Sequence, residues 1–219
     1  MTKTLLFLAL PFVSILTLTA QHYYTSKDKA NAIVWQHMIN ETEEFIVYAK
    51  NSVQPTGTIT TSSGEVIKFD YSCWIYYVNY PLTNNSKYLI VKETKWNLLE
   101  INAKNDEGPS NLQDWKVIPI KICDVGNPLT DLPWMEEVIK SLQNVTNSTH
   151  YIDIRICTYK DGLGFLISPC MFFNNGMPYE LRNCEGKKLC TRCGYTDTCE
   201  WFDIDNENTV IIWSKKPLY

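Results

Sequence analysis

Eight cysteines constrain the fold of this chain more than any other feature of its sequence. Four of them fall in one short stretch, CEGKKLCTRCGYTDTC, which begins at Cys184 and ends at Cys199. Such a cluster is typical of a disulfide-stapled loop, a zinc site or a thiol redox motif. The eight are Cys73, Cys123, Cys157, Cys170, Cys184, Cys190, Cys193 and Cys199.

The N-terminal residues indicate the compartment in which these cysteines would reside. Lys3 precedes an apolar run over residues 5–18, and Ala20 ends a suitable cleavage site. This pattern predicts a secretory signal peptide over residues 1–20, followed by a single secreted domain over residues 21–219. The run is too short to span a membrane, and no later run reaches the roughly 18 apolar residues required. We therefore expect a secreted, extracellular protein with no membrane contact.

In an oxidising compartment an even number of cysteines predicts disulfides, and we expect all eight to be paired. The sequence leaves the pairing open. A zinc site is the first alternative, but the CxxC pair of Cys190 and Cys193 has no second such pair nearby and no neighbouring histidine. Redox chemistry at the same pair is the second alternative.

Four N-x-S/T sequons fit the same compartment, because such sites are glycosylated during export. They begin at Asn40, Asn84, Asn144 and Asn147. The last two lie in the polar stretch LQNVTNSTH, which is typical of a loop. The net charge is −4 and no basic patch is present, so we expect no nucleic-acid partner.

Hydrophobic periodicity predicts mostly strands. Residues 65–80 alternate with a period of two, and other strand-like segments cover 43–51, 87–103, 115–125, 150–160, 164–173, 177–184 and 207–215. Pro119 places the segment 115–125 at a sheet edge or a bulge. Residues 51–64 are rich in hydroxyls with Pro and Gly, and indicate a loop or an exposed hairpin.

Two segments have helical spacing instead. Residues 131–144 have Asp131 as a candidate N-cap, Pro133 in the first turn, and an apolar face of Trp134, Val138 and Leu142. A second apolar face, over residues 32–39, indicates a short helix near the start of the mature chain. The predicted fold class is mainly β: a disulfide-bonded β-sandwich with one short mid-chain helix.

The sequence contains no motif that would carry catalysis. It has no nucleophile elbow, no phosphate-binding glycine loop and no HExxH pair, and its histidines (His22, His37 and His150) are scattered. The acidic segment 201–209 lacks the glycine and closing glutamate of a calcium loop. We therefore expect a protein that is not an enzyme and that holds no metal or cofactor.

The order of several segments resembles one known family. These segments are GEVIKFDYSC (64–73), KYLIVKETKW (87–96), MEEVIKSLQ (135–143) and IDIRIC (152–157), followed by Cys170 and Cys184. Over residues 64–184 the chain is similar to the poxvirus immune-evasion domain, the β-sandwich of secreted viral chemokine-binding proteins. The resemblance implies capture of a host chemokine, another cytokine or a class I histocompatibility molecule. Residues 51–64, however, carry none of the acidic side chains found in the corresponding loop of some chemokine-binding members.

The resemblance thus implies a secreted immune-evasion protein that sequesters a host chemokine or other cytokine by covering its receptor-binding surface. The tract CWIYYVNY offers candidate anchors in Trp74, Tyr76, Tyr77 and Tyr80, with core packing as the alternative role. A second hypothesis is a carrier of small molecules or lipids like the tick salivary lipocalins, which residues 39–51 resemble at their first strand. A third, an extracellular enzyme, has no motif in its favour.

Overall fold

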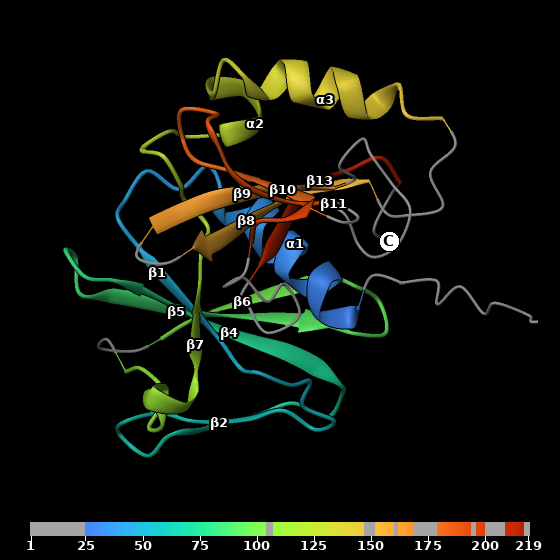
Figure 1. The fold of residues 1–219 in the computed structure, drawn as a ribbon. Coiled ribbons are helices and arrows are strands. Elements are labelled where there is room, and N and C mark those ends of the chain that lie inside the picture. The colour runs from blue at the N-terminus through green and yellow to red at the C-terminus, as the bar shows by residue number, and fades with distance from the viewer. Residues whose placement is uncertain are drawn as a thin grey trace, which may run out of the picture.

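Two antiparallel sheets, stacked with a helix between them, form the core of the computed structural model (Figure 1). The structure describes residues 25–103, 107–146, 152–159, 162–168, 179–193, 196–199 and 209–216. The predicted signal peptide, Cys170, Asn147 and most of the acidic segment 201–209 lie outside these residues. The mainly β, disulfide-bonded sandwich predicted from the sequence is confirmed.

The first sheet, sheet I, has the strand order β6-β5-β4-β1-β7. Its strands are β1 (Ile46–Ala49), β4 (Cys73–Tyr80), β5 (Asn85–Lys92), β6 (Leu98–Asn102) and β7 (Lys116–Ile118). β7 is an edge strand that ends directly before Pro119, which confirms the placement predicted from that proline. The predicted segment 87–103 forms two strands, β5 and β6, joined by a turn.

The second sheet, sheet II, has the strand order β12-β11-β10-β9-β8-β13. Its strands are β8 (Asp153–Tyr159), β9 (Gly162–Ser168), β10 (Tyr179–Arg182), β11 (Lys188–Cys193), β12 (Thr196–Asp197) and β13 (Val210–Ser214). Strands β11 and β12 were not predicted, because their residues lie in the cysteine-rich stretch and lack a clear hydrophobic alternation.

A hairpin of β2 (Thr58–Thr60) and β3 (Val66–Lys68) covers the outer face of sheet I, the face turned away from sheet II (Figure 1). Ile59 from this hairpin packs with Ile75, Tyr77 and Tyr88 in one buried cluster. Residues 51–64 were predicted to form either a loop or an exposed hairpin. The structure shows that they contribute to a hairpin, which packs by one face onto sheet I.

Helix α1 (Ser26–Met38) lies between the two sheets (Figure 1). A capping box fixes its start: the Asp28 backbone N–H donates to the Thr25 hydroxyl at 3.1 Å, and the Thr25 N–H donates to the Asp28 carboxylate at 3.0 Å. Inside, the Tyr76 hydroxyl donates to Asn31 Oδ1 at 2.8 Å, and Asn31 Nδ2 donates to the Thr209 carbonyl at 3.3 Å. These two bonds tie the helix to both sheets.

The predicted mid-chain helix is in fact two helices, α2 (Pro128–Asp131) and α3 (Met135–Gln143). Asp131 was expected to cap the start of the helix but instead ends α2, where its carboxylate accepts the Asn127 backbone N–H at 2.7 Å. Pro133 explains the break, because proline has no N–H to donate and disfavours helical geometry in the residue before it. Val138 and Leu142 of α3 are buried as predicted, while Trp134 packs edge-on against Phe165.

Two disulfides join the described cysteines: Cys123–Cys184 and Cys190–Cys199. The prediction that all eight cysteines are paired is wrong for Cys73 and Cys157, which are buried thiols. The two cannot meet, because Cys73 packs in the cluster under the hairpin and Cys157 packs in a separate cluster on sheet II. The Cys157 thiol donates to the Gly164 carbonyl at 3.4 Å. The side chains of Cys170 and Cys193 lie outside the described part of the chain.

Candidate functional site

The four aromatic residues proposed as binding anchors are all buried, with at most 7% of any side chain exposed. They are Trp74, Tyr76, Tyr77 and Tyr80. Their prediction as surface anchors is therefore wrong, and the alternative of core packing holds. The strand that carries them, β4, is third of five in sheet I and has both faces covered, one by α1 and one by the β2–β3 hairpin.

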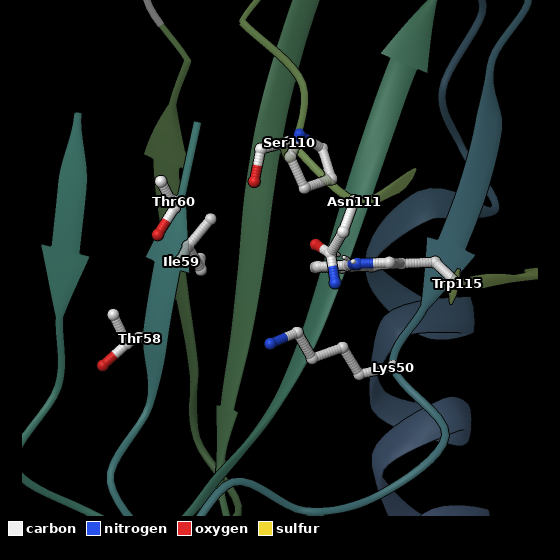
Figure 2. Close-up of a pocket in the computed structure, with 8 residues that line it drawn as sticks. Lys50, Thr58, Ile59, Thr60, Ser110, Asn111 and Trp115 are labelled. Atoms are coloured by element: carbon white, nitrogen blue, oxygen red, sulfur yellow. Dashed lines mark hydrogen bonds between the residues drawn. The ribbon is translucent and has the colours of Figure 1, made fainter. Parts of the chain in front are cut away.

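A groove opens beside the same hairpin, where the hairpin meets the segment before β7 (Figure 2). Its volume is about 290 Å³, close to the lower end of the range for ligand sites. We call it the hairpin groove. It is lined by Lys50, Thr58, Ile59, Thr60, Pro109, Ser110, Asn111 and Trp115.

Backbone hydrogen bonds from three elements hold the walls of the hairpin groove. Lys50 directly follows β1, and its N–H donates to the Ile75 carbonyl of β4 at 3.1 Å. The Ser110 N–H donates to the Thr60 carbonyl of β2 at 2.9 Å. The groove is thus built into the sheet ladder, and its shape does not depend on side chains alone.

The far wall of the groove is the indole of Trp115, which is 6% exposed. Trp115 directly follows the 3₁₀ turn η1 (Leu112–Asp114). Its Nε1–H donates to Asn111 Oδ1 at 3.4 Å, and Asn111 Nδ2 donates to the Asp114 carboxylate at 3.1 Å. This chain of hydrogen bonds fixes the Asn111 amide beside the indole nitrogen (Figure 2).

Lys50 brings a positive charge into the groove. Its Nζ lies 5.5 Å from the centroid of the Trp115 ring, a cation–π distance. Figure 2 shows that its amino group, the Asn111 amide and the Ser110 hydroxyl face the same space, whereas the hydroxyls of Thr58 and Thr60 point away from it. Burial lowers the pKa of the Lys50 ammonium from its ordinary value.

Within the described part of the chain, Lys50 forms no ion pair. Besides burial, the group that acts on its pKa is the Cys73 thiol. Burial raises the pKa of Cys73 above its ordinary value, so this thiol stays neutral at pH 7 and does not balance the charge. The hairpin groove therefore contains a half-buried cation without a counter-charge of its own.

A second pocket, of about 450 Å³, lies at the start of β5. In contrast to Lys50, the lysine in this pocket is paired with carboxylates. Lys87 is 8% exposed there. Its Nζ lies 2.9 Å from a Glu41 oxygen and 3.3 Å from a Glu100 oxygen. Burial lowers the pKa of Lys87, but hydrogen bonds with Tyr80 and Glu41 and the charge of Glu100 outweigh it and raise the pKa above its ordinary value. The positive charge of Lys87 is already balanced by carboxylates of the protein, so this lysine stabilises the fold.

A partly exposed strip of side chains continues from the hairpin groove along the edge of sheet I. Val117 of β7 is 51% exposed and pairs with the half-buried Tyr48 of β1. Because side chains alternate along a strand, Val117 lies on the same face as Trp115, and Tyr48 on the same face as Lys50. We call these four residues the β7 strip. It combines the exposed Val117 with the half-buried Tyr48 and Lys50 and with the indole of Trp115, which is itself buried.

The predicted sequons lie on the surface where the structure describes them: Asn40, Asn84 and Asn144 are all exposed. No group of three or more potential metal ligands occurs among the described residues. Helices of the same residues are all too short or too polar to cross a membrane.

Sequence reasoning missed the hairpin groove, because Lys50 and Trp115 are 65 positions apart and no motif links them. The β1–β7 pairing brings them together, with Ala49 opposite Lys116. The sequence shows only that Lys50 lies near the end of one predicted strand segment and that Trp115 begins another. Comparison with known proteins adds no further guide, since no family model, curated protein or solved structure matches the chain.

Proposed function

We propose that this chain is a secreted binding protein that sequesters a host immune protein by covering its receptor-binding surface, without catalysis. The observation that carries the proposal is the β7 strip beside the hairpin groove. Protein interfaces are enriched in aromatic and apolar anchors surrounded by polar groups. The strip offers an apolar anchor in the half-exposed Val117 and an aromatic one in the half-buried Tyr48, next to the charged Lys50.

The rigidity of the surroundings supports the proposal. Tyr48 rests on Tyr77 with ring centroids 6.1 Å apart, and Trp115 is held by its bond to Asn111. A preorganised surface loses less conformational entropy when it binds than a flexible one does. The strip is therefore suited to tight capture of a partner without rearrangement.

The charge of the strip bears on the class of partner. Lys50 is the charged side chain of the β7 strip, and the hairpin residues 51–64 beside it carry no charge. Complementary potentials favour association, so this face suits a cytokine with a neutral or acidic contact region better than a strongly basic chemokine. The proposed partner is thus a host cytokine, in line with the resemblance to the poxvirus immune-evasion domain.

A lipocalin-type carrier is the less favoured candidate. Lipocalins enclose their ligand in one closed up-and-down barrel. The described strands divide instead between two sheets and a separate hairpin, with α1 in the space between the sheets. This arrangement supports a protein that binds through its surface.

The test is capture of purified host cytokines, chemokines and class I molecules by the immobilised secreted protein. We expect at least one cytokine to bind saturably, and Val117→Arg to weaken that binding at least about tenfold, because it places a charge in the apolar strip. Leu189→Arg is the matched control, since Leu189 is a 40% exposed leucine on sheet II. Absence of any saturable partner would refute the proposed function, and equal loss with both variants would refute the β7 strip as its surface.

A further inference from the structure

The hairpin groove and the Lys87 pocket each contain a lysine ammonium, half-buried at Lys50 and buried at Lys87, but the two differ in their charged partners. Lys87 has two carboxylates within 3.3 Å. Lys50 has none among the described residues, although burial lowers its pKa and so disfavours its charge. A buried charge is costly unless it is paired. The absence of a carboxylate beside Lys50 among the described residues is therefore the feature of the groove that indicates a ligand.

We propose that the hairpin groove binds a carboxylate, supplied by an acidic side chain of the captured protein. The Lys50 ammonium provides the charge, and the Asn111 amide and the Ser110 hydroxyl provide neutral hydrogen-bond donors facing the same space (Figure 2). The source of the carboxylate, though not the site itself, rests on the proposed function.

The groove matches a carboxylate better than a phosphate or sulfate group. It holds a single cation, which balances one negative charge, whereas doubly charged oxyanions are usually met by arginine clusters or helix N-termini. Its volume of about 290 Å³ suits one side chain. The indole of Trp115 forms a flat wall against which the methylene groups of a glutamate could pack.

Other lysines over aromatic rings lack this combination. Lys92 lies 3.7 Å from the centroid of Tyr71 on the same sheet and is half-buried like Lys50. It does not line the groove. Lys92 therefore provides a control with the same charge and the same kind of aromatic contact.

The experiment uses two capped tripeptides, N-acetyl-Ala-Glu-Ala-amide and its glutamine counterpart, which differ only in charge at one side chain. Each is titrated into the ¹⁵N-labelled secreted protein, and the Trp115 indole N–H is followed by NMR. We expect the glutamate peptide to shift this signal saturably and to bind at least about tenfold more tightly than the glutamine peptide, because charge-assisted hydrogen bonds are stronger than neutral ones. Lys50→Met should remove that preference, and Lys92→Met should retain it.

Several results would overturn the inference: equal binding of the two peptides, a preference that survives Lys50→Met, or tighter binding of inorganic sulfate than of the glutamate peptide. The capture assay separates this inference from the proposed function. If a cytokine binds wild type and Lys50→Met equally, the carboxylate site is wrong and the function stands. If the glutamate peptide binds through Lys50 but no host protein is captured, the site stands and the proposed function fails.

Discussion

Replacing Tyr76 by phenylalanine should destabilise the protein without affecting its surface. The change removes one hydroxyl, which donates to Asn31 Oδ1 at 2.8 Å in a fully buried position. Asn31 is 1% exposed, so its carbonyl oxygen would lose its donor with no water to replace it. A buried acceptor left unsatisfied in this way costs about 1–3 kcal/mol. For a chain of 219 residues this corresponds to a fall in Tm of roughly 2–4 °C for each kcal/mol.

Urea unfolding of the disulfide-bonded protein, followed by tryptophan fluorescence, measures the loss. Tyr71→Phe is the matched control, because Tyr71 is half-exposed and its hydroxyl forms no hydrogen bond among the described residues; its effect should stay below about 0.5 kcal/mol. In a double-mutant cycle, Tyr76→Phe and Asn31→Ala should be non-additive by about 0.5 kcal/mol or more. Stability equal to wild type for Tyr76→Phe, or strict additivity in the cycle, would refute the role assigned to this bond.

Three further predictions concern other parts of the molecule. Glu41→Gln should lower stability by about 1 kcal/mol at pH 7. The hydrogen bond with Lys87 holds the pKa of Glu41 below its ordinary value, so the difference from wild type should vanish as the pH falls through that folded pKa. Urea titrations at several pH values measure this difference. Thiol titration without reductant should detect almost no reactive thiol in the native protein and at least two after denaturation, from Cys73 and Cys157; a native protein that reacts at once would contradict their burial. Peptide mass mapping should find a glycan at Asn144, and unmodified peptide at this exposed site in protein from mammalian cells would count against export through the secretory pathway.

The sequence predicted the strands with strong alternation and the helices with clear apolar faces, because burial on one side leaves a period in the sequence. It could not predict that all four aromatic residues of β4 would be buried. Alternation indicates only that neighbouring side chains point to opposite faces. That both faces of β4 are covered follows from the position of α1 and of the β2–β3 hairpin, which are set by long-range packing.

The cysteines show the same limit. An even count in an oxidising compartment predicts pairing, and this holds for Cys123–Cys184 and Cys190–Cys199. It fails for Cys73 because this thiol packs among apolar side chains under the hairpin, in a cluster that contains no second cysteine among the described residues. A buried cysteine of this kind behaves as a small hydrophobic residue, and its sequence context does not reveal the difference.

The position of α1 has a consequence for how the chain is made. One side of the helix can pack on β4 and β5 once they exist, but its contacts with β13 come from the other end of the chain, and Asn31 and Thr209 are separated by 178 positions. At about 5–20 residues per second, Thr209 is synthesised roughly 9–36 s after Asn31. During that interval the helix lacks its contacts with β13. Chaperones would therefore meet an incomplete molecule, and truncation before β13 should leave α1 without its second partner even though its own sequence is intact.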